Sequence, residues 1–230
     1  MTKLYVLNPA STKDEARASR DDEAMSWEVV QCAVYGTVPT KRLTPLVIES
    51  IPSPVADVSW TWMSDLMVTD RVKYIFEREK ITGCKFEPVM SLGAIPPLAA
   101  PIRLWELRVT GFTGFADTAR GVVIRVRCDD CGLYSYTLGG PFASLVKESS
   151  WDGSDVFTMW PFPAVQIGTE RVRDVIVRYN VPGVALMPIE EFEVPNGHAA
   201  PGFPSEWLND AALKKLMADG DFSEAVMDRT

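Results

Sequence analysis

The chain of 230 residues carries 31 Asp and Glu against 23 Lys and Arg, so its formal net charge is −8 when its single histidine is neutral. This acidic balance argues against nucleic acid as a partner, because a phosphate backbone attracts basic surfaces. A composition of 47% hydrophobic and 23% charged residues is typical of a globular protein with a substantial core, and it excludes the disordered and fibrous classes.

The sequence contains no run of about 18 apolar residues, which a membrane-spanning helix would need. Its amino terminus lacks the basic start, apolar centre and small-residue cleavage site of a signal peptide. Four cysteines are too few for a disulfide scaffold and indicate a reducing compartment. We therefore expect a cytoplasmic protein with no membrane partner.

Short apolar strands and one helix are predicted in the first half of the chain, residues 1–90. The charged, Ala/Ser-rich residues 8–25 are expected to form a loop or a frayed helix. The helix is expected to follow Thr69, whose hydroxyl is well placed as an N-cap, and to stop at Gly83. Strands are predicted at residues 4–7, 27–34, 46–51 and 84–89.

A Pro- and Ala-rich linker is predicted at residues 91–102, and it separates the first half from a second half at residues 103–192. The second half is expected to contain a helix at residues 169–179. Strands are predicted at residues 104–110, 122–127, 133–138 and 184–189.

The remaining residues 193–230 are predicted to form a loop and a C-terminal helix. Ser205 is expected to cap this helix, and Gly220 to end it. The helical residues predicted to face the core are Leu208, Ala212, Leu213 and Leu216.

Two helix-strand segments, residues 68–89 and 168–189, lie one hundred residues apart and share Thr, Arg, Val, Arg, Gly and Pro at matching positions. About one identity would be expected by chance. Trp60 and Trp160 also fall into register. Any capped helix followed by a glycine and a strand could look similar, but capping does not require the shared Arg and Pro. We therefore favour an internal duplication.

Cys128 and Cys131 lie in the sequence CDDCG between two predicted strands, so this CxxCG occupies a hairpin turn. Such a turn is the context of a zinc knuckle, in which both thiolates point at one ion. A redox-active CxxC would precede a helix instead. The two intervening aspartates also disfavour a thiolate without a metal. These features favour metal binding over redox catalysis.

A related sequence, CAVYG, begins at Cys32 and has Tyr35 where a second cysteine would stand. It lies 37 residues before Thr69, against 41 from Cys128 to Thr169, so both halves have the same order of parts. The predicted fold class is therefore α+β, with two related strand–knuckle–helix–strand halves packed as one domain, plus a C-terminal helix.

The two CxxCG-like positions, the segment SWDGSDVF at residues 150–157, and the following TERV with its GV..MP ending resemble the double-CXXCG motif family. This family occurs as many paralogues in myxobacteria, and some members are similar to immunity proteins encoded beside toxins. The resemblance is clearest over residues 103–192.

The resemblance implies that Cys32, Cys128 and Cys131 occupy ligand positions of one structural zinc, whereas Tyr35 departs from the pattern. Three cysteines could hold zinc together with water, His198 or an acidic neighbour. The alternative is a hairpin that has lost its metal.

Histidine-dependent catalysis is disfavoured because His198 is the only histidine and lies in a Pro/Gly-rich segment. A Ser-His-Asp or Cys-His site, or a zinc hydrolase, would have to be built around that one residue. Phosphate-binding glycine loops are also absent from the sequence. We expect no catalytic residues and no enzyme, although a carboxylate-dependent reaction stays open.

Trp60 and Trp62 are the best candidates for exposed partner-binding aromatics, because strand alternation would place both rings on one face. Asp152 and Asp155 could form a functional loop. The favoured alternative for that segment is an Asp-Gly turn that enters a strand and packs its aromatic residues in the core.

The resemblance suggests a cytoplasmic immunity protein that binds and neutralises a cognate protein toxin, encoded by a neighbouring gene. An acidic surface would speed the encounter with a basic toxin. The alternative is a structural zinc-knuckle adaptor, an interaction protein that neutralises no toxin.

Overall fold

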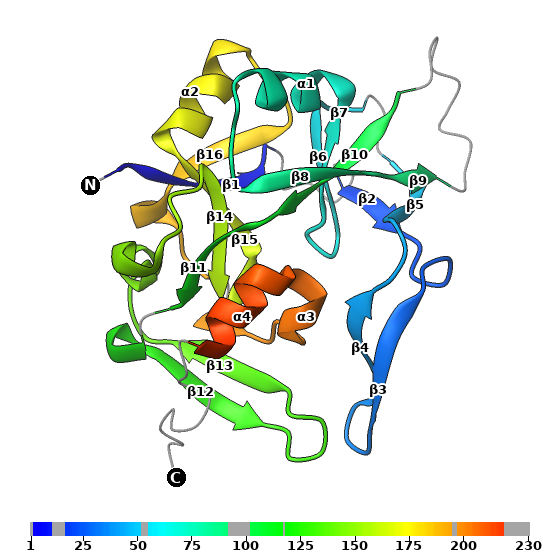
Figure 1. Ribbon diagram of the computed structural model, residues 1–230, viewed down its shortest axis with the longest axis vertical. Coiled ribbons are helices and arrows are strands. Elements are labelled where there is room, and N and C mark those ends of the chain that lie inside the picture. The colour runs from blue at the N-terminus through cyan, green and yellow to red at the C-terminus, as the bar shows by residue number, and fades with distance from the viewer. Residues whose placement is uncertain are drawn as a thin grey trace.

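The computed structural model describes residues 2–10, 17–51, 55–91, 102–116, 118–194 and 197–218. The α+β class is confirmed: two mixed sheets lie beside two hairpins and a small set of helices (Figure 1). Within these ranges no helix combines the length and apolar character needed to cross a membrane.

One sheet contains five strands and carries most of the second half of the chain. Its strands, in spatial order, are β11 (Gly111–Phe115), β14 (Val156–Trp160), β15 (Phe162–Thr169), β1 (Leu4–Pro9) and β16 (Val184–Pro188).

The other sheet contains seven strands and carries most of the first half. Its strands, in spatial order, are β8 (Cys84–Pro88), β10 (Leu104–Val109), β7 (Leu66–Thr69), β6 (Val58–Thr61), β2 (Arg17–Arg20), β5 (Val47–Ser50) and β9 (Met90–Ser91).

The two halves exchange their first strands. β1 lies between β15 and β16 of the second half, and β10 lies between β7 and β8 of the first. The registers match, because Leu4 pairs with Thr169 as Leu104 pairs with Thr69. Each half therefore completes the other's sheet. The expected linker lies almost entirely outside the described residues.

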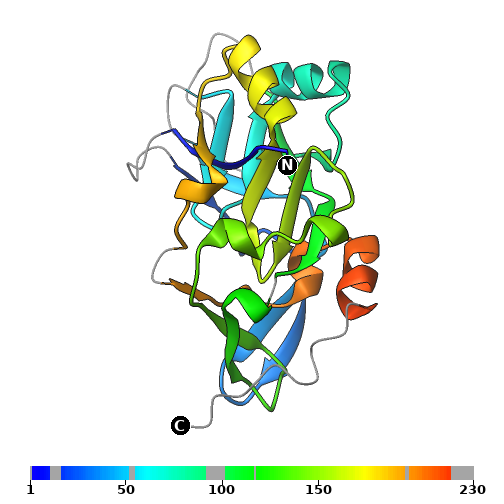
Figure 2. The ribbon, with the colours of Figure 1, turned by 90° about the vertical axis from the view of Figure 1, so that its left-hand side faces the viewer.

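Two equivalent helices, α1 (Asp70–Arg78) and α2 (Glu170–Arg178), follow β7 and β15 and lie side by side at one end of the molecule (Figures 1 and 2). Their apolar faces share one core with the exchanged sheets, as helical spacing predicted. The buried helical residues are Val72, Ile75, Phe76, Val172, Val175 and Ile176.

The N-cap prediction for Thr69 is wrong in its detail. Its side chain makes no capping bond and instead donates to Asp57, with Oγ1 to Oδ1 at 2.8 Å. The loop or frayed helix expected at residues 8–25 is also wrong in part, because β2 lies there. Ala18 of β2 is fully buried between β5 and β6, and this tertiary contact decides its conformation.

The C-terminal helix is present but is divided into α3 (Pro204–Trp207) and α4 (Asp210–Ala218). Asn209 caps α4 by accepting the backbone N–H of Ala212 at 2.9 Å. The cap predicted at Ser205 is wrong, since its hydroxyl donates to the Thr40 carbonyl at 2.8 Å. Leu208, Ala212 and Leu216 are buried as predicted, Leu213 is partly buried, and Gly220 lies outside the described residues.

Two hairpins extend together from the other end of the molecule (Figures 1 and 2). One is β3 (Trp27–Cys32) with β4 (Gly36–Arg42), and the other is β12 (Val122–Arg127) with β13 (Tyr134–Leu138), which also pairs with β17 (His198–Ala199). Short 3-10 helices lie at Thr118–Arg120, Phe142–Leu145, Glu148–Ser150 and Ile189–Glu191.

Candidate metal centre

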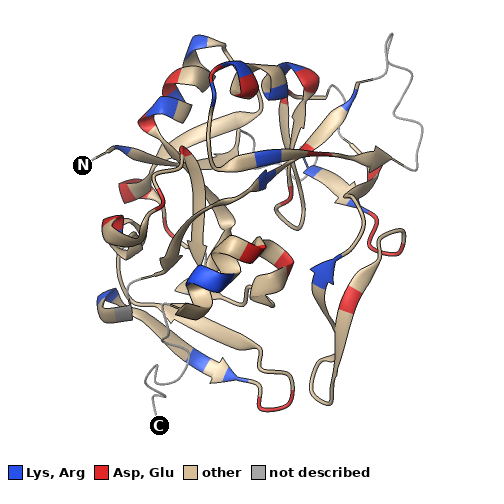
Figure 3. Ribbon diagram, viewed as in Figure 1, with Lys and Arg blue, Asp and Glu red and all other residues tan. Residues whose placement is uncertain are grey.

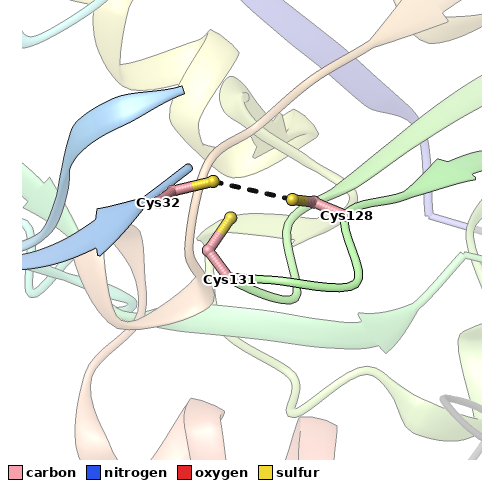
Figure 4. A group of neighbouring side chains, drawn as sticks. All are labelled: Cys32, Cys128 and Cys131. Carbon is pink, nitrogen blue, oxygen red and sulfur yellow. Dashed lines mark hydrogen bonds between the residues drawn. The ribbon is translucent and has the colours of Figure 1, made fainter. Parts of the chain in front are cut away.

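The tips of the two hairpins bring three cysteine sulfurs together (Figure 4). The Sγ atoms of Cys32 and Cys128 are 3.6 Å apart, and the Sγ of Cys131 completes a group whose members all lie within 4.8 Å of one another. Zn–S bonds of about 2.3 Å in a tetrahedron place sulfurs about 3.8 Å apart. The three predicted ligands therefore converge at a spacing that suits a metal ion.

Both hairpin tips have the same turn. Gly36 and Gly132 have φ angles of +73° and +75°, the left-handed conformation that glycine adopts without strain. The backbone N–H groups of Val34 and Tyr35 each donate to Cys32 Sγ at 3.4 Å. CAVYG thus folds as a knuckle turn although its second cysteine is a tyrosine.

Backbone hydrogen bonds also favour a thiolate at Cys128. The backbone N–H groups of Cys131 and Asp130 donate to its sulfur and lower the pKa of the Cys128 thiol. Burial instead raises the pKa of Cys131 to about 11. A bound cation would offset the cost of burying the charged sulfur and would lower the pKa of the Cys131 thiol.

Asp130 links the two tips, because its carboxylate accepts the backbone N–H of Ala33. Sequence reasoning treated this residue only as a charge beside the thiols. The only sequence feature that could have indicated this contact is the position of Asp130 within the CDDCG turn.

The fourth ligand position is less defined. Tyr35 is 55% exposed. His198 belongs to β17, and its backbone pairs with Thr137, which lies at the end of β13 away from the CDDCG turn. Three thiolates would leave one position of a tetrahedral ion to water or another oxygen ligand. The donor set therefore fits a thiophilic ion with one open position.

A cluster of buried charges lies where β4 meets the seven-stranded sheet, around a cavity of about 70 Å³. Arg42 pairs with Glu106 and lies 3.6 Å from Asp65, which also contacts Arg20 at 3.4 Å. Burial raises the pKa of Glu106, and Arg42 opposes that shift. Burial also raises the pKa of Glu206 to about 7. This cluster fixes the base of the Cys32 hairpin.

The proposed pair of exposed tryptophans is wrong for Trp60, which is only 4% exposed and directs its indole N–H at Gln166. Strand β6 ends at Thr61, so alternation does not extend to Trp62. Trp62 lies in the turn before β7, is 47% exposed, and contacts the guanidinium of Arg17. Trp62 remains a candidate for partner contact.

Asp155 is buried and structural rather than free to bind a partner. Its carboxylate accepts the backbone N–H of Thr82 at 3.0 Å and pairs with Arg171 at 2.6 Å. Asp152 is exposed, but its carboxylate accepts the backbone N–H groups of Phe112 and Ser154, both at 3.0 Å. The segment is thus an Asp-Gly turn, the favoured alternative.

Comparison with models of known protein families gives no match for this chain. A search of curated proteins likewise finds no similar sequence.

Proposed function

We propose that the protein is a binding protein whose two hairpins are held together by one structural zinc, and that it neutralises a cognate protein toxin. The proposal rests on the convergence of three cysteines from two hairpins, of which Cys32 and Cys128 lie 96 residues apart in the sequence. Sulfur ligands in a tetrahedral arrangement favour zinc over the hard cations. The ion would fix the relative position of the two tips.

Exposed apolar residues on the same hairpins support a binding role. Val34 and Tyr35 at one tip are 69% and 55% exposed, and Val126 on the other hairpin is 50% exposed. Apolar groups gathered on a rigid exposed element are a common feature of protein interfaces. A metal that fixes the tips would reduce the entropy lost when they bind a partner.

Charge supports a basic partner. Asp129 and Asp130 give the β12–β13 tip an acidic end (Figure 3), and the chain as a whole is acidic. Such a surface attracts a basic toxin and speeds association. The resemblance to the double-CXXCG motif family points to immunity in the cytoplasm, with the toxin encoded by a neighbouring gene.

The second candidate is a zinc-knuckle adaptor without toxin neutralisation. The same three cysteines favour it, because a structural metal site needs no toxin. The two candidates predict the same metal content and differ only in the partner.

A rescue experiment tests neutralisation. The gene immediately upstream is expressed in a laboratory host with and without this protein, and surviving cells are counted. Rescue that Tyr35→Asp abolishes and Tyr74→Asp preserves would support immunity through the hairpin tip, since Tyr74 is 62% exposed on α1. Toxicity that the protein leaves unchanged would contradict the immunity role and favour the adaptor.

Metal analysis of the purified protein tests the zinc. We expect about one zinc per chain, lost in Cys128→Ser and retained in Cys84→Ser, because Cys84 lies in β8 and outside the cluster. A wild-type protein without zinc after refolding in its presence would contradict the proposed cofactor.

A further inference from the structure

We infer that Cys32 and Cys128 are also a disulfide-forming pair, which cross-links the two hairpins when no metal holds the sulfurs. This goes beyond the proposed function, since it requires neither zinc nor a toxin. The two sulfurs are 3.6 Å apart and both cysteines are buried. A disulfide bond is about 2.05 Å long, so a small inward movement of the two tips brings the sulfurs to bonding distance.

The fold selects this pair over the neighbouring Cys128 and Cys131. Within the knuckle turn, the N–H of Cys131 donates to the sulfur of Cys128, and the N–H of Gly132 donates to the Cys128 carbonyl at 2.8 Å. These bonds hold both thiols of CDDCG toward Cys32 (Figure 4). A bond between Cys128 and Cys131 would disturb the N–H to sulfur contact within the turn, whereas the 3.6 Å contact between Cys128 and Cys32 forms across the two tips.

The oxidation is an exchange with a low-molecular-weight disulfide such as oxidised glutathione. One cysteine thiolate attacks the glutathione disulfide, forms a mixed disulfide and releases one glutathione thiolate. The second cysteine then attacks the protein-bound sulfur, forms the Cys32–Cys128 bond and releases the other. Two cysteine thiols are oxidised, and one glutathione disulfide is reduced to two thiols.

Cys131 gives this cross-link a resolving thiol. Its sulfur lies within 4.8 Å of both partners, and it is the most exposed member of the group. It can attack the sulfur of Cys32, which forms a Cys32–Cys131 disulfide and releases the Cys128 thiolate. A small thiol can then reduce this more exposed bond through a mixed disulfide, which returns all three cysteines to the thiol form. The cross-link also consumes two of the three sulfurs, so metal binding and oxidation exclude each other.

The test uses the full chain after removal of metal with a chelator, equilibrated with oxidised and reduced glutathione. Free thiols should fall from four to two, and peptide mapping without reductant should find Cys32 joined to Cys128. Cys131→Ser should still form this bond, and Cys84→Ser should behave as wild type. Four free thiols under oxidising conditions, or a bond mainly between Cys128 and Cys131, would overturn the inference.

A parallel sample loaded with zinc separates this inference from the proposed cofactor. Zinc should keep all four thiols reduced. If the Cys32–Cys128 bond forms equally fast with and without zinc, the disulfide assignment stands and the proposed zinc site fails. Zinc binding in a chain that never forms the bond would support the zinc site and overturn the disulfide assignment.

Discussion

Arg71 and Arg171 reach reciprocally across the interface between the two helices. Arg71 of α1 donates to the carbonyl oxygen of Tyr179 at the end of α2, and Arg171 of α2 donates to the carbonyl oxygen of Glu79 at the end of α1. Each guanidinium also pairs with a carboxylate that precedes its own helix, Asp57 for Arg71 and Asp155 for Arg171. The first of the two arginines shared by the duplicated segments is therefore an interface residue.

The same reciprocity explains the shared glycines. A Cβ at Gly83 would lie 1.9 Å from the carbonyl oxygen of Val156, and a Cβ at Gly183 would lie 2.1 Å from that of Val58. Each glycine thus allows the strand of the other half to approach closely. The residues that are identical in the two halves therefore include some that make contacts between the halves, as well as those that begin and end the helices.

Arg171→Ala is expected to destabilise the protein by about 1–2 kcal/mol, because it leaves Asp155 and the final carbonyls of α1 without a charged donor. Arg178→Ala is the control on the same helix. Its exposed pair with Glu79 at 3.4 Å should contribute less than about 1 kcal/mol. Urea unfolding measures both, and equal effects would contradict the interface role.

Gly183→Ala is expected to lower stability by about 3 kcal/mol or more, since the new Cβ would collide with backbone and the residue has a φ of +96°. Gly153→Ala provides a matched control, because its φ is +79° but nothing lies within 4 Å of the added carbon. That variant should lose only about 1 kcal/mol from conformational strain. Thermal unfolding of both variants separates collision from strain.

Glu206 should make stability depend on pH. Burial raises its folded-state pKa from 4.5 to about 7, while Arg20 and Arg42 oppose this shift. Between these two pKa values the folded chain holds a proton that the unfolded chain releases, so stability falls as pH rises through the window. Because the side chain is partly exposed, we expect a loss of about 1–2 kcal/mol.

Glu206→Gln removes this titration. At pH 4 the variant and wild type should have similar unfolding free energies, and at pH 8 the variant should be the more stable. The measured quantity is the difference between the two proteins in urea unfolding across this range. A difference that stays constant with pH would show that the Glu206 carboxyl titrates normally.

Trp60→Ala and Trp62→Ala should affect different properties. Loss of the buried Trp60 ring should destabilise the protein by about 3–5 kcal/mol. Loss of the half-exposed Trp62 ring should change stability by less than about 1 kcal/mol. If a partner is found, reduced affinity in Trp62→Ala with unchanged unfolding would assign this turn to the interface.

The local elements could be predicted from the order of residues alone. Helical spacing, glycine stops and β-branched runs predicted α1, α2 and eight of the seventeen strands in the described residues close to their observed bounds, because these signals act over a few residues. The strands of the two sheet centres, β6, β7, β14 and β15, were not assigned bounds from the sequence. The order of parts in the two halves and the CxxCG turn placed Cys32 and Cys128 at equivalent positions of two turns, with Cys131 in the same turn as Cys128. That the three are ligands of one metal was expected from the resemblance to the double-CXXCG motif family, and the folded chain brings their sulfurs within 4.8 Å of one another.

The contacts that connect these elements emerged only in the folded chain. The exchange of β1 and β10 depends on pairing between distant segments, and no local pattern encodes the partner of a strand. The burial of Trp60 and Asp155, and the exposure of Trp62, follow from where strands end and which half covers them. Long-range packing, rather than residue type, therefore determined which of these side chains are buried in the structure and which are exposed.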